Sequence, residues 1–181
     1  MILGISGKMG SGKTTLADHI VLIVPGCVRK AFGDPLKIEA SLEYGFPLDW
    51  AYRGKDRVVH SHRGANTVRD LLQYWGTDVR RAQDPIYWLK AMDKYVGQDL
   101  DAGAHVVVDD VRFENEADWV LARGGVLVRV DTYDGWVPGP FSEHVSETDL
   151  DDYELFTKRI RPPLGGLSSA AVQLVRELGF V

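Results

Sequence analysis

Short apolar segments alternate along the chain with stretches in which apolar residues recur at helical spacing. The apolar segments predict β-strands at residues 1–6, 28–32, 105–108 and 126–130, with a last short strand at 153–156. The helical spacing predicts helices at residues 14–24, 36–44, 68–74, 116–122 and 168–178. Asp84-Pro85 looks like one more helix start, and the apolar stripe after it is expected to stop at Gly97. Because strands that are apolar on both faces alternate with helices, we expect an α/β fold of three layers, with a central parallel β-sheet flanked by helices.

Two stretches lack this regularity. Residues 47–66 lose periodicity and gain charge, which predicts a loop or a mobile insertion, and Gly76 is expected to interrupt the helix that follows. Residues 131–152 are acidic and rich in turn residues, so we expect irregular structure there. The length of 181 residues fits a single domain, 1–181, with a helical and loop insertion at about 34–97.

Composition narrows the class of protein. Hydrophobic residues make up 45% of the chain and charged residues 26%, which is ordinary for a globular protein and argues against disorder. The formal net charge of −5 argues against a protein that coats a nucleic-acid polymer. Cys27 is the one cysteine and cannot form an internal disulfide, and no apolar segment approaches the length of a membrane span. With no sign of a leader sequence either, we expect a soluble cytoplasmic protein with no membrane partner.

A glycine-rich sequence between the first strand and the first helix carries the strongest chemical signal. Residues 7–14 match the pattern of glycine, four residues, glycine, lysine and serine or threonine. In this pattern, main-chain N–H groups and a helix N-terminus hold phosphate oxygens, the lysine reaches the β- and γ-phosphates, and the hydroxyl holds Mg²⁺. The pattern predicts an ATP site and the P-loop NTPase form of the fold. The predicted ATP-binding residues are Gly7, Lys8, Met9, Gly10, Ser11, Gly12, Lys13, Thr14 and Thr15.

An acidic pair follows the strand at 105–108, at the edge where a parallel sheet binds its ligands. Mg²⁺ requires oxygen ligands beyond the hydroxyl of Thr14, so at least one of Asp109 and Asp110 is expected to serve the metal. The other carboxylate is free to cap the next turn. We expect the metal site to comprise Thr14, Asp109 and Asp110.

Arginine residues predict a second site for phosphate. Arg112 follows the acidic pair, and Arg69, Arg80 and Arg81 precede it, with Gln73 one helical turn after Arg69. Guanidinium groups bind phosphate in bidentate fashion and neutralise charge that develops during phosphoryl transfer. The alternative for any single arginine is a solvated surface charge. Basic residues, Arg63 included, outnumber acidic ones between Arg53 and Arg81, which favours an anionic ligand.

Five blocks occur in a characteristic order: residues 32–37, residues 69–77, Trp88, residues 109–116 and residues 144–147. Together they resemble the blocks of the bacteriophage deoxynucleoside monophosphate kinase family, which has a P-loop fold like that of nucleoside monophosphate kinases. The resemblance implies Mg²⁺-dependent transfer of the γ-phosphoryl group of ATP to a deoxynucleoside 5′-monophosphate. The products are ADP and a deoxynucleoside diphosphate, a DNA precursor, made in the host cytoplasm if a phage encodes the chain.

The resemblance also implies roles for individual residues. Lys13, Asp110 and Arg112 are expected to be catalytic, and the 34–97 insertion is expected to bind the acceptor. Tyr74 or Trp75 would stack on the base, with a place in the hydrophobic core as the alternative. A homodimer rests on family analogy alone. The implied acceptor-binding residues are Lys37, Arg69, Gln73, Trp75, Arg80 and Arg112.

Three alternatives stay open. The acceptor could be another small phosphorylated molecule, as in phosphomevalonate kinase, or the chain could be a nucleotide-binding switch without transferase activity. Residues 131–157 contain no lysine or arginine, so the basic lid of related kinases would lie in the stretch 53–81 or depend on Arg123 and Arg129. The resemblance gives no role for His144 and Glu147.

Overall fold

The computed structural model describes residues 1–62, 65–139 and 142–180, which form two compact units. Unit 1 consists of Met1–Ala31 and Val96–Val181, and unit 2 is Phe32–Tyr95. The boundary between them falls within α5 (Tyr87–Asp101).

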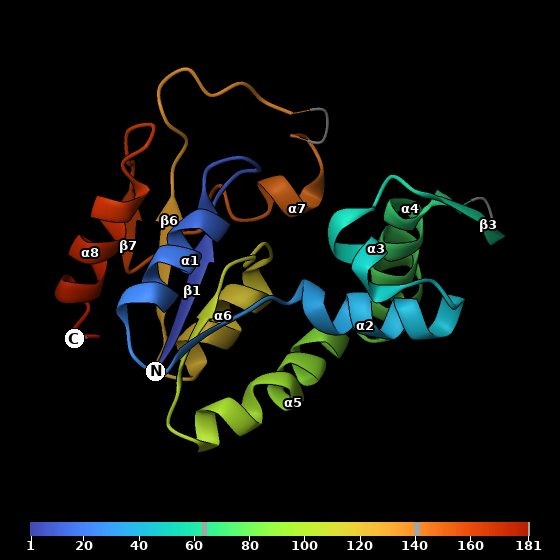
Figure 1. Ribbon diagram of the computed structural model, residues 1–181, viewed down its shortest axis with the longest axis horizontal. Helices are drawn as coiled ribbons and strands as arrows, with labels where there is room; N and C mark the ends of the chain where they lie inside the picture. Colours follow the sequence, from blue (N-terminus) through green and yellow to red (C-terminus); the bar gives the residue numbers. More distant parts are fainter. Residues whose placement is uncertain (63–64, 140–141, 181) are drawn as a thin grey trace. The chain divides into compact units, whose positions relative to one another are not determined.

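A five-stranded parallel sheet forms the centre of unit 1 (Figure 1), in the order β2, β5, β1, β6 and β7. β1 lies in the middle, where Leu3 pairs with Val107 on one side and with Val126 on the other. The predicted parallel sheet is therefore confirmed. The strands are β1 (Ile2–Ser6), β2 (Cys27–Lys30), β5 (His105–Val108), β6 (Val126–Val130) and β7 (Lys158–Ile160).

Alternate residues of β1 face two layers of helices. Leu3 and Ile5 pack in one core with residues of α1 (Lys13–Ile23) and α8 (Leu167–Glu177). Gly4 points to the opposite face, towards α6 (Glu114–Ala122), where an added Cβ would lie 3.0 Å from Cγ2 of Val120. The three-layer α/β fold expected from the sequence is confirmed. No helix within the described residues is both long and apolar enough to cross a membrane.

Two predictions in unit 1 were wrong. The last strand is β7 at Lys158–Ile160, not residues 153–156, because β7 is a partly exposed, basic edge strand without an apolar pattern. α5 continues through Gly97 to Asp101, because a glycine inside a helix is tolerated at a cost of about 1 kcal/mol. Residues 131–139 are irregular as expected, and the acidic segment also contains the short helix α7 (Val145–Thr148).

Unit 2 is helical with one small hairpin. Its apolar core includes Ala40, Ala51, Leu71 and Trp88. Residues 47–66, expected to be a loop, contain α3 and much of the antiparallel hairpin β3–β4, so that prediction was wrong. Arg63 lies outside the described residues. The elements are α2 (Gly33–Tyr44), α3 (Leu48–Arg53), β3 (Val58–His62), β4 (Ala65–Thr67), α4 (Val68–Gln73) and the π-helix η1 (Tyr74–Arg81), followed by the first part of α5.

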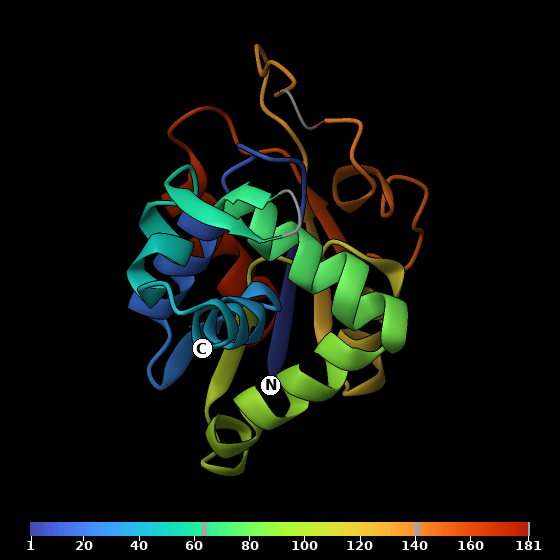
Figure 2. The same ribbon diagram turned by 90° about the vertical axis from the view of Figure 1, so that its right-hand side faces the viewer.

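Gly76 does not interrupt the helix, contrary to the prediction. α4 and η1 follow each other directly and form one continuous helical ribbon (Figure 2). Gly76 allows a close approach instead, since an added Cβ would lie 3.0 Å from Cδ2 of Leu36 on α2. Its carbonyl oxygen accepts a hydrogen bond from Nε1 of Trp88 at 3.0 Å. The glycine thus serves packing between helices.

Candidate active site

The glycine-rich loop connects the end of β1 to the start of α1. Gly10 and Gly12 adopt φ values of 79° and 95°, a backbone conformation that residues with side chains rarely adopt. Gly12 is the N-cap of α1 and provides no side-chain cap. The first N–H groups of the helix are therefore available to an anion, which is the arrangement that binds phosphate.

Lys13 is buried at the base of this loop, with 8% of its surface exposed. Its Nζ atom donates hydrogen bonds to the carbonyl oxygens of Gly7 at 2.7 Å and Lys8 at 2.8 Å. Burial, the nearby guanidinium of Arg112 and, to a smaller extent, that of Arg129 lower the pKa of Lys13 from 10.5 to about 8, although Glu147 and Asp109 oppose the shift. The protein thus holds a poorly solvated cation where a phosphate group would stabilise it.

The interior of the loop fits a phosphate group in two further respects. The hydroxyl of Ser11 is buried and has no hydrogen-bond partner among the described residues. A Cβ added at Gly7 would overlap the carbonyl oxygen of Val130 and lie 2.7 Å from Oγ of Ser11. An unsatisfied buried donor beside a backbone that admits no side chain indicates a cradle for an oxygen-rich ligand.

The predicted metal residues lie around the same end of the sheet. Thr14 and Thr15 are exposed in the first turn of α1, whereas Asp109 is buried after β5 and pairs with Nη1 of Arg29 at 3.0 Å. Asp110 is half-buried. Within the described ranges no three acidic, histidine or cysteine side chains gather to hold a metal by themselves. Mg²⁺ in this site would therefore need phosphate oxygens and water besides the hydroxyl of Thr14 and one carboxylate.

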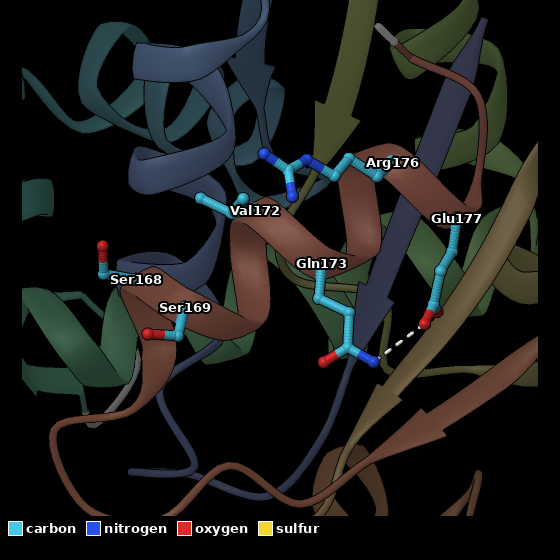
Figure 3. Close-up of a pocket in the computed structure, with 6 residues that line it drawn as sticks. All are labelled: Ser168, Ser169, Val172, Gln173, Arg176 and Glu177. Atoms are coloured by element: carbon cyan, nitrogen blue, oxygen red, sulfur yellow. Dashed lines mark hydrogen bonds between the residues drawn. The ribbon is translucent and has the colours of Figure 1, made fainter.

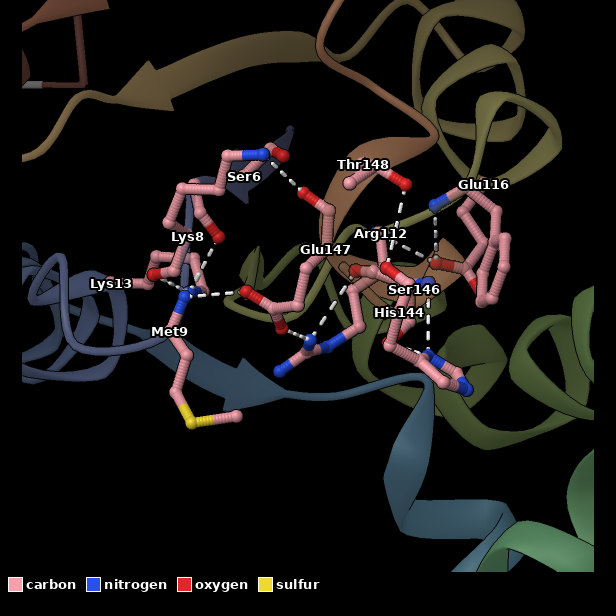
Figure 4. A network of polar contacts seen from close by, with 12 residues as sticks. Ser6, Lys8, Met9, Lys13, Arg112, Glu116, His144, Ser146, Glu147 and Thr148 are labelled. Carbon is pink, nitrogen blue, oxygen red and sulfur yellow. Dashed lines mark hydrogen bonds and ion pairs between the residues drawn. The ribbon is translucent and has the colours of Figure 1, made fainter. Parts of the chain in front are cut away.

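Arg112 lies beside the loop and is fixed by residues of two other elements (Figure 4). Its main-chain N–H donates to the carboxylate of Glu116 on α6 at 2.9 Å. Its Nη1 atom forms an ion pair with Glu147 of α7, and Glu147 also accepts a hydrogen bond from the N–H of Met9 at 2.6 Å. Glu147 is thus a residue of the site for which sequence reasoning found no role. The sequence signal that could have identified Glu147 is its place in residues 144–147, one of the five blocks that resemble the kinase family.

Lys8 and Arg129 are also engaged by the acidic segment. Lys8 donates to the carbonyl oxygen of Glu147 at 2.7 Å and pairs with Asp151. Arg129 is buried and contacts the same carboxylate at 2.8 Å as well as Oγ of Ser6 at 3.1 Å. Of the two arginines considered for a lid, Arg129 therefore lies inside the fold, and Arg123 stacks over the ring of Trp119 at 4.2 Å.

The predicted acceptor residues of unit 2 do not form one cluster. Arg80 and Trp75 meet at Glu39, which pairs with Arg80 and accepts a hydrogen bond from Nε1 of Trp75 at 3.2 Å. Lys37 pairs with Asp34 at 3.0 Å, Arg69 pairs with Asp56 at 3.0 Å, and the side chain of Gln73 is exposed.

Trp75 belongs to the core of unit 2 and also borders a cavity. The guanidinium of Arg80 covers one face of its ring at 4.4 Å, and the side chain is 8% exposed. The cavity has a volume of about 530 Å³ and is lined by Glu43, Tyr44, Tyr74, Trp75, Asp78, Val79 and Gln83. Both aromatic residues proposed to stack on a base, Tyr74 and Trp75, therefore border the same cavity.

An open surface hollow of about 470 Å³ lies along one face of α8 (Figure 3). Its lining residues come from this one helix, and the amide of Gln173 donates to Glu177 at 2.8 Å. None of the predicted site residues lines it.

A family match and one viral relative indicate the same family for this chain. Residues 47–154 match the deoxynucleotide monophosphate kinase family. A candidate deoxynucleotide monophosphate kinase of Acanthamoeba polyphaga mimivirus is 34% identical over 167 residues, which cover 83% of this chain and 82% of the relative. An uncharacterised protein of Ictalurid herpesvirus 1 is 28% identical over 152 residues, and the match spans 83% of this chain and 59% of that protein.

Two solved structures with the same fold are proteins described in other terms. The tunicamycin resistance protein of Deinococcus radiodurans matches with a TM-score of 0.55 at 16% identity, over 99% of this chain and 96% of that one. A sugar kinase from a Janibacter species matches with a TM-score of 0.52 at 16% identity, over 99% of this chain and 95% of that one. At these identities the likeness shows the fold alone.

Proposed function

The chain belongs to the deoxynucleotide monophosphate kinase family, and from that membership we propose that it transfers the γ-phosphoryl group of ATP to a deoxynucleoside 5′-monophosphate, with Mg²⁺. The family makes the protein a nucleotide kinase, a phosphotransferase. The identity of donor and acceptor, the metal and a role in supplying DNA precursors are the proposed part. Family membership favours a deoxynucleotide over phosphomevalonate as acceptor and a kinase over a switch.

The observation that carries the proposal is the burial of the Lys13 ammonium group within the phosphate-binding loop. This group is bonded to the carbonyl oxygens of Gly7 and Lys8, with its pKa lowered to about 8. An ammonium group held in this way gains more from a bound β- or γ-phosphate than a solvated lysine does, since it has already lost its water. Lys13 would then stabilise negative charge on the oxygen between the β- and γ-phosphates as the bond to the γ-phosphorus breaks.

The remaining steps need positioning and charge, and no base. The acceptor phosphate has a second pKa near 6 and is largely a dianion at neutral pH, so its oxygen attacks without losing a proton. One phosphorus–oxygen bond forms to the acceptor as the bond to ADP breaks. Arg112 would bind the acceptor phosphate, while the N–H groups of the loop hold the phosphates of ATP. Thr14 and one of Asp109 and Asp110 would hold Mg²⁺, which would supply positive charge to the phosphate groups of ATP.

The contacts of the proposed acceptor-binding residues in unit 2 favour this role for some of them more than for others. Arg69 and Lys37 are held in ion pairs that a phosphate group could replace. Arg80 is packed against Trp75 and Tyr87, which favours a role in ordering the acceptor-binding helices over contact with phosphate. Gln73 is exposed and can offer both a donor and an acceptor to a base edge.

A coupled ADP-release assay with ATP, Mg²⁺ and a panel of ribo- and deoxynucleoside monophosphates tests the proposal. We expect at least one deoxynucleotide to accelerate ADP release well above the rate without acceptor. Intact nucleotide binding without acceleration by any deoxynucleotide would refute the proposal. Arg112→Ala is expected to raise the KM for the acceptor more than the KM for ATP, whereas Arg123→Ala, which removes an arginine stacked on Trp119, serves as the matched control.

A further inference from the structure

A buried carboxylate lies against the phosphate-binding loop. Glu147 has 2% of its side chain exposed, and Figure 4 shows it between the main-chain nitrogen of Met9 and the guanidinium group of Arg112. One carboxylate oxygen accepts the Met9 N–H at 2.6 Å, and the other pairs with Nη1 of Arg112. A single side chain thus joins the loop to the residue proposed to bind the acceptor phosphate.

An acidic side chain is unexpected beside a site for anionic phosphates. Its charge repels a nucleotide, and its burial is unfavourable unless cations and N–H groups compensate for the lost water. Both of its oxygens are satisfied here, by one N–H group and one guanidinium group. The structure therefore retains a carboxylate where nucleotide binding alone would favour a neutral residue, which indicates a role in ordering the site.

Hydrogen bonds hold both the main chain and the guanidinium group of Arg112. Its main-chain N–H is held by Glu116 at 2.9 Å, and Nη1 is held by Glu147 and by the carbonyl oxygen of Ser146 at 3.4 Å. Among the described residues, the contacts of the guanidinium group all use Nη1. The opposite edge, formed by Nε and Nη2, remains available, and this pair of N–H donors matches two oxygens of a phosphate group.

The short helix that carries Glu147 is itself held in place. Nδ1 of His144 accepts the N–H of Ser146 at 3.2 Å, which caps α7, and the N–H of Glu147 donates to the carbonyl oxygen of His144 at 2.7 Å. Lys8 of the loop donates to the carbonyl oxygen of Glu147 at 2.7 Å. Loop, helix and arginine are therefore linked through Glu147 by both its main chain and its side chain.

We propose that Glu147 is a positioning residue for phosphoryl transfer: it orients the guanidinium group of Arg112 towards the acceptor phosphate and fixes that group to the phosphate-binding loop at Met9. The inference rests on the proposed function, because it assigns the acceptor phosphate to Arg112. Without Glu147, the arginine loses the partner that selects one rotamer, and the distance between acceptor and donor sites varies. Misplacement of a reacting group by about 1 Å reduces turnover by up to about 100-fold.

The test compares Glu147→Gln and Glu147→Asp with Glu143→Gln, a matched control because Glu143 is an exposed acidic residue of the same segment. The glutamine keeps the shape and the acceptor for Met9 but loses the ion pair with Arg112. The aspartate keeps the charge but is one methylene shorter and cannot reach both partners from the same backbone position. We expect both variants to lower kcat about 10-fold or more and to raise the acceptor KM, with the dissociation constant for Mg·ADP changed by less than about threefold. Glu143→Gln is expected to behave like the wild type.

A double-mutant cycle completes the test. If Glu147 acts through Arg112, then Glu147→Gln lowers kcat much less in an Arg112→Ala background than in the wild type. Full additivity, or wild-type kcat in both Glu147 variants, would overturn the inference. The inference would also be overturned if Glu147→Gln bound Mg·ADP about 10-fold more tightly with unchanged kcat. The carboxylate of Glu147 would then compete with the nucleotide for the loop and would not position Arg112. Wild-type turnover is measured first: its absence refutes the proposed function and this inference with it, whereas wild-type turnover with unaltered variants refutes the inference alone.

Discussion

Replacing Lys13 with methionine separates its role in the fold from its role in catalysis. Lys13 is buried, and its pKa in the folded protein is about 8 against an ordinary value of 10.5. At pH 7 the charged lysine therefore lowers the unfolding free energy by about 3 kcal/mol, because each unit of difference between the two pKa values corresponds to about 1.36 kcal/mol. Methionine has a similar length and no charge, so it removes this cost.

The pH dependence of this effect has a definite sign. The folded state binds fewer protons at Lys13 than the unfolded state does between pH 8 and 10.5, so the wild type gains stability from this group as the pH rises through that window. Below pH 8 the lysine is charged in both states and its full cost remains. The advantage of Lys13→Met in unfolding free energy is therefore largest at or below pH 7, and it should shrink by about 2 kcal/mol between pH 7 and pH 10.

Two hydrogen bonds act in the opposite direction. Methionine leaves the carbonyl oxygens of Gly7 and Lys8 without the ammonium donor, at a cost of about 1 kcal/mol each. The net gain at pH 7 is then about 1 kcal/mol. The lysine can donate these bonds in its charged and its neutral form. Their loss therefore changes the difference in unfolding free energy between the two proteins by the same amount at every pH.

Urea unfolding of the nucleotide-free proteins at pH 7, 8, 9 and 10 provides the measurement. We expect the difference in unfolding free energy, variant minus wild type, to decrease steadily above pH 8, and the variant to lose turnover by about 100-fold or more. A difference that does not depend on pH, or that grows with pH, would refute the assignment of a depressed pKa to Lys13. Near wild-type turnover in the variant would show that the loop is not catalytic.

Three further predictions concern the loop, unit 2 and the metal. Gly7→Ala should lower the unfolding free energy by about 2 kcal/mol or more and weaken ATP binding, because its Cβ meets the carbonyl oxygen of Val130. Gly135→Ala is the control: its φ is 88° and no atom lies within 4 Å of the added Cβ, so it should cost about 1 kcal/mol. Equal losses in the two variants would contradict the steric argument. Thr67→Ala removes the side chain that caps α4 and accepts the N–H of Asp70, so it should cost about 1 kcal/mol in denaturant unfolding, and an unchanged midpoint would show that the cap does not stabilise α4. EDTA should abolish phosphoryl transfer and added Mg²⁺ should restore it, whereas full activity in EDTA would exclude a required divalent ion.

The phosphate-binding loop shows which features could be predicted from sequence. The predicted strand at 1–6 and helix at 14–24 each lie within one residue of β1 and α1 at both ends. The signal is local, because the glycines, Lys13 and the flanking apolar segments all belong to one strand–loop–helix unit. The strands at 105–108 and 126–130 were predicted with their observed limits for a similar reason, since each is a mostly apolar run next to polar or glycine-containing turns.

Features that depend on contacts distant in sequence were not predicted. Glu147 meets Met9 across 138 positions of the chain, so no spacing rule connects them. The low helix propensity of glycine predicts an interruption of the helix at Gly76, but close packing against Leu36 and a hydrogen bond from Trp88 explain why glycine stands there. β7 escaped detection because an edge strand of Lys158, Arg159 and Ile160 lacks the apolar pattern of the central strands.

Isotopic labelling follows directly the proposed transfer of a phosphoryl group between two nucleotides. The protein is incubated with Mg²⁺, ATP labelled at the γ-phosphorus and each deoxynucleoside 5′-monophosphate, and the nucleotides are separated by ion-exchange chromatography. We expect the label to appear at the β-phosphate of a deoxynucleoside diphosphate, in an amount equal to the ADP formed. Label recovered only as inorganic phosphate, with unlabelled monophosphate remaining for every deoxynucleotide, would contradict the proposed transfer.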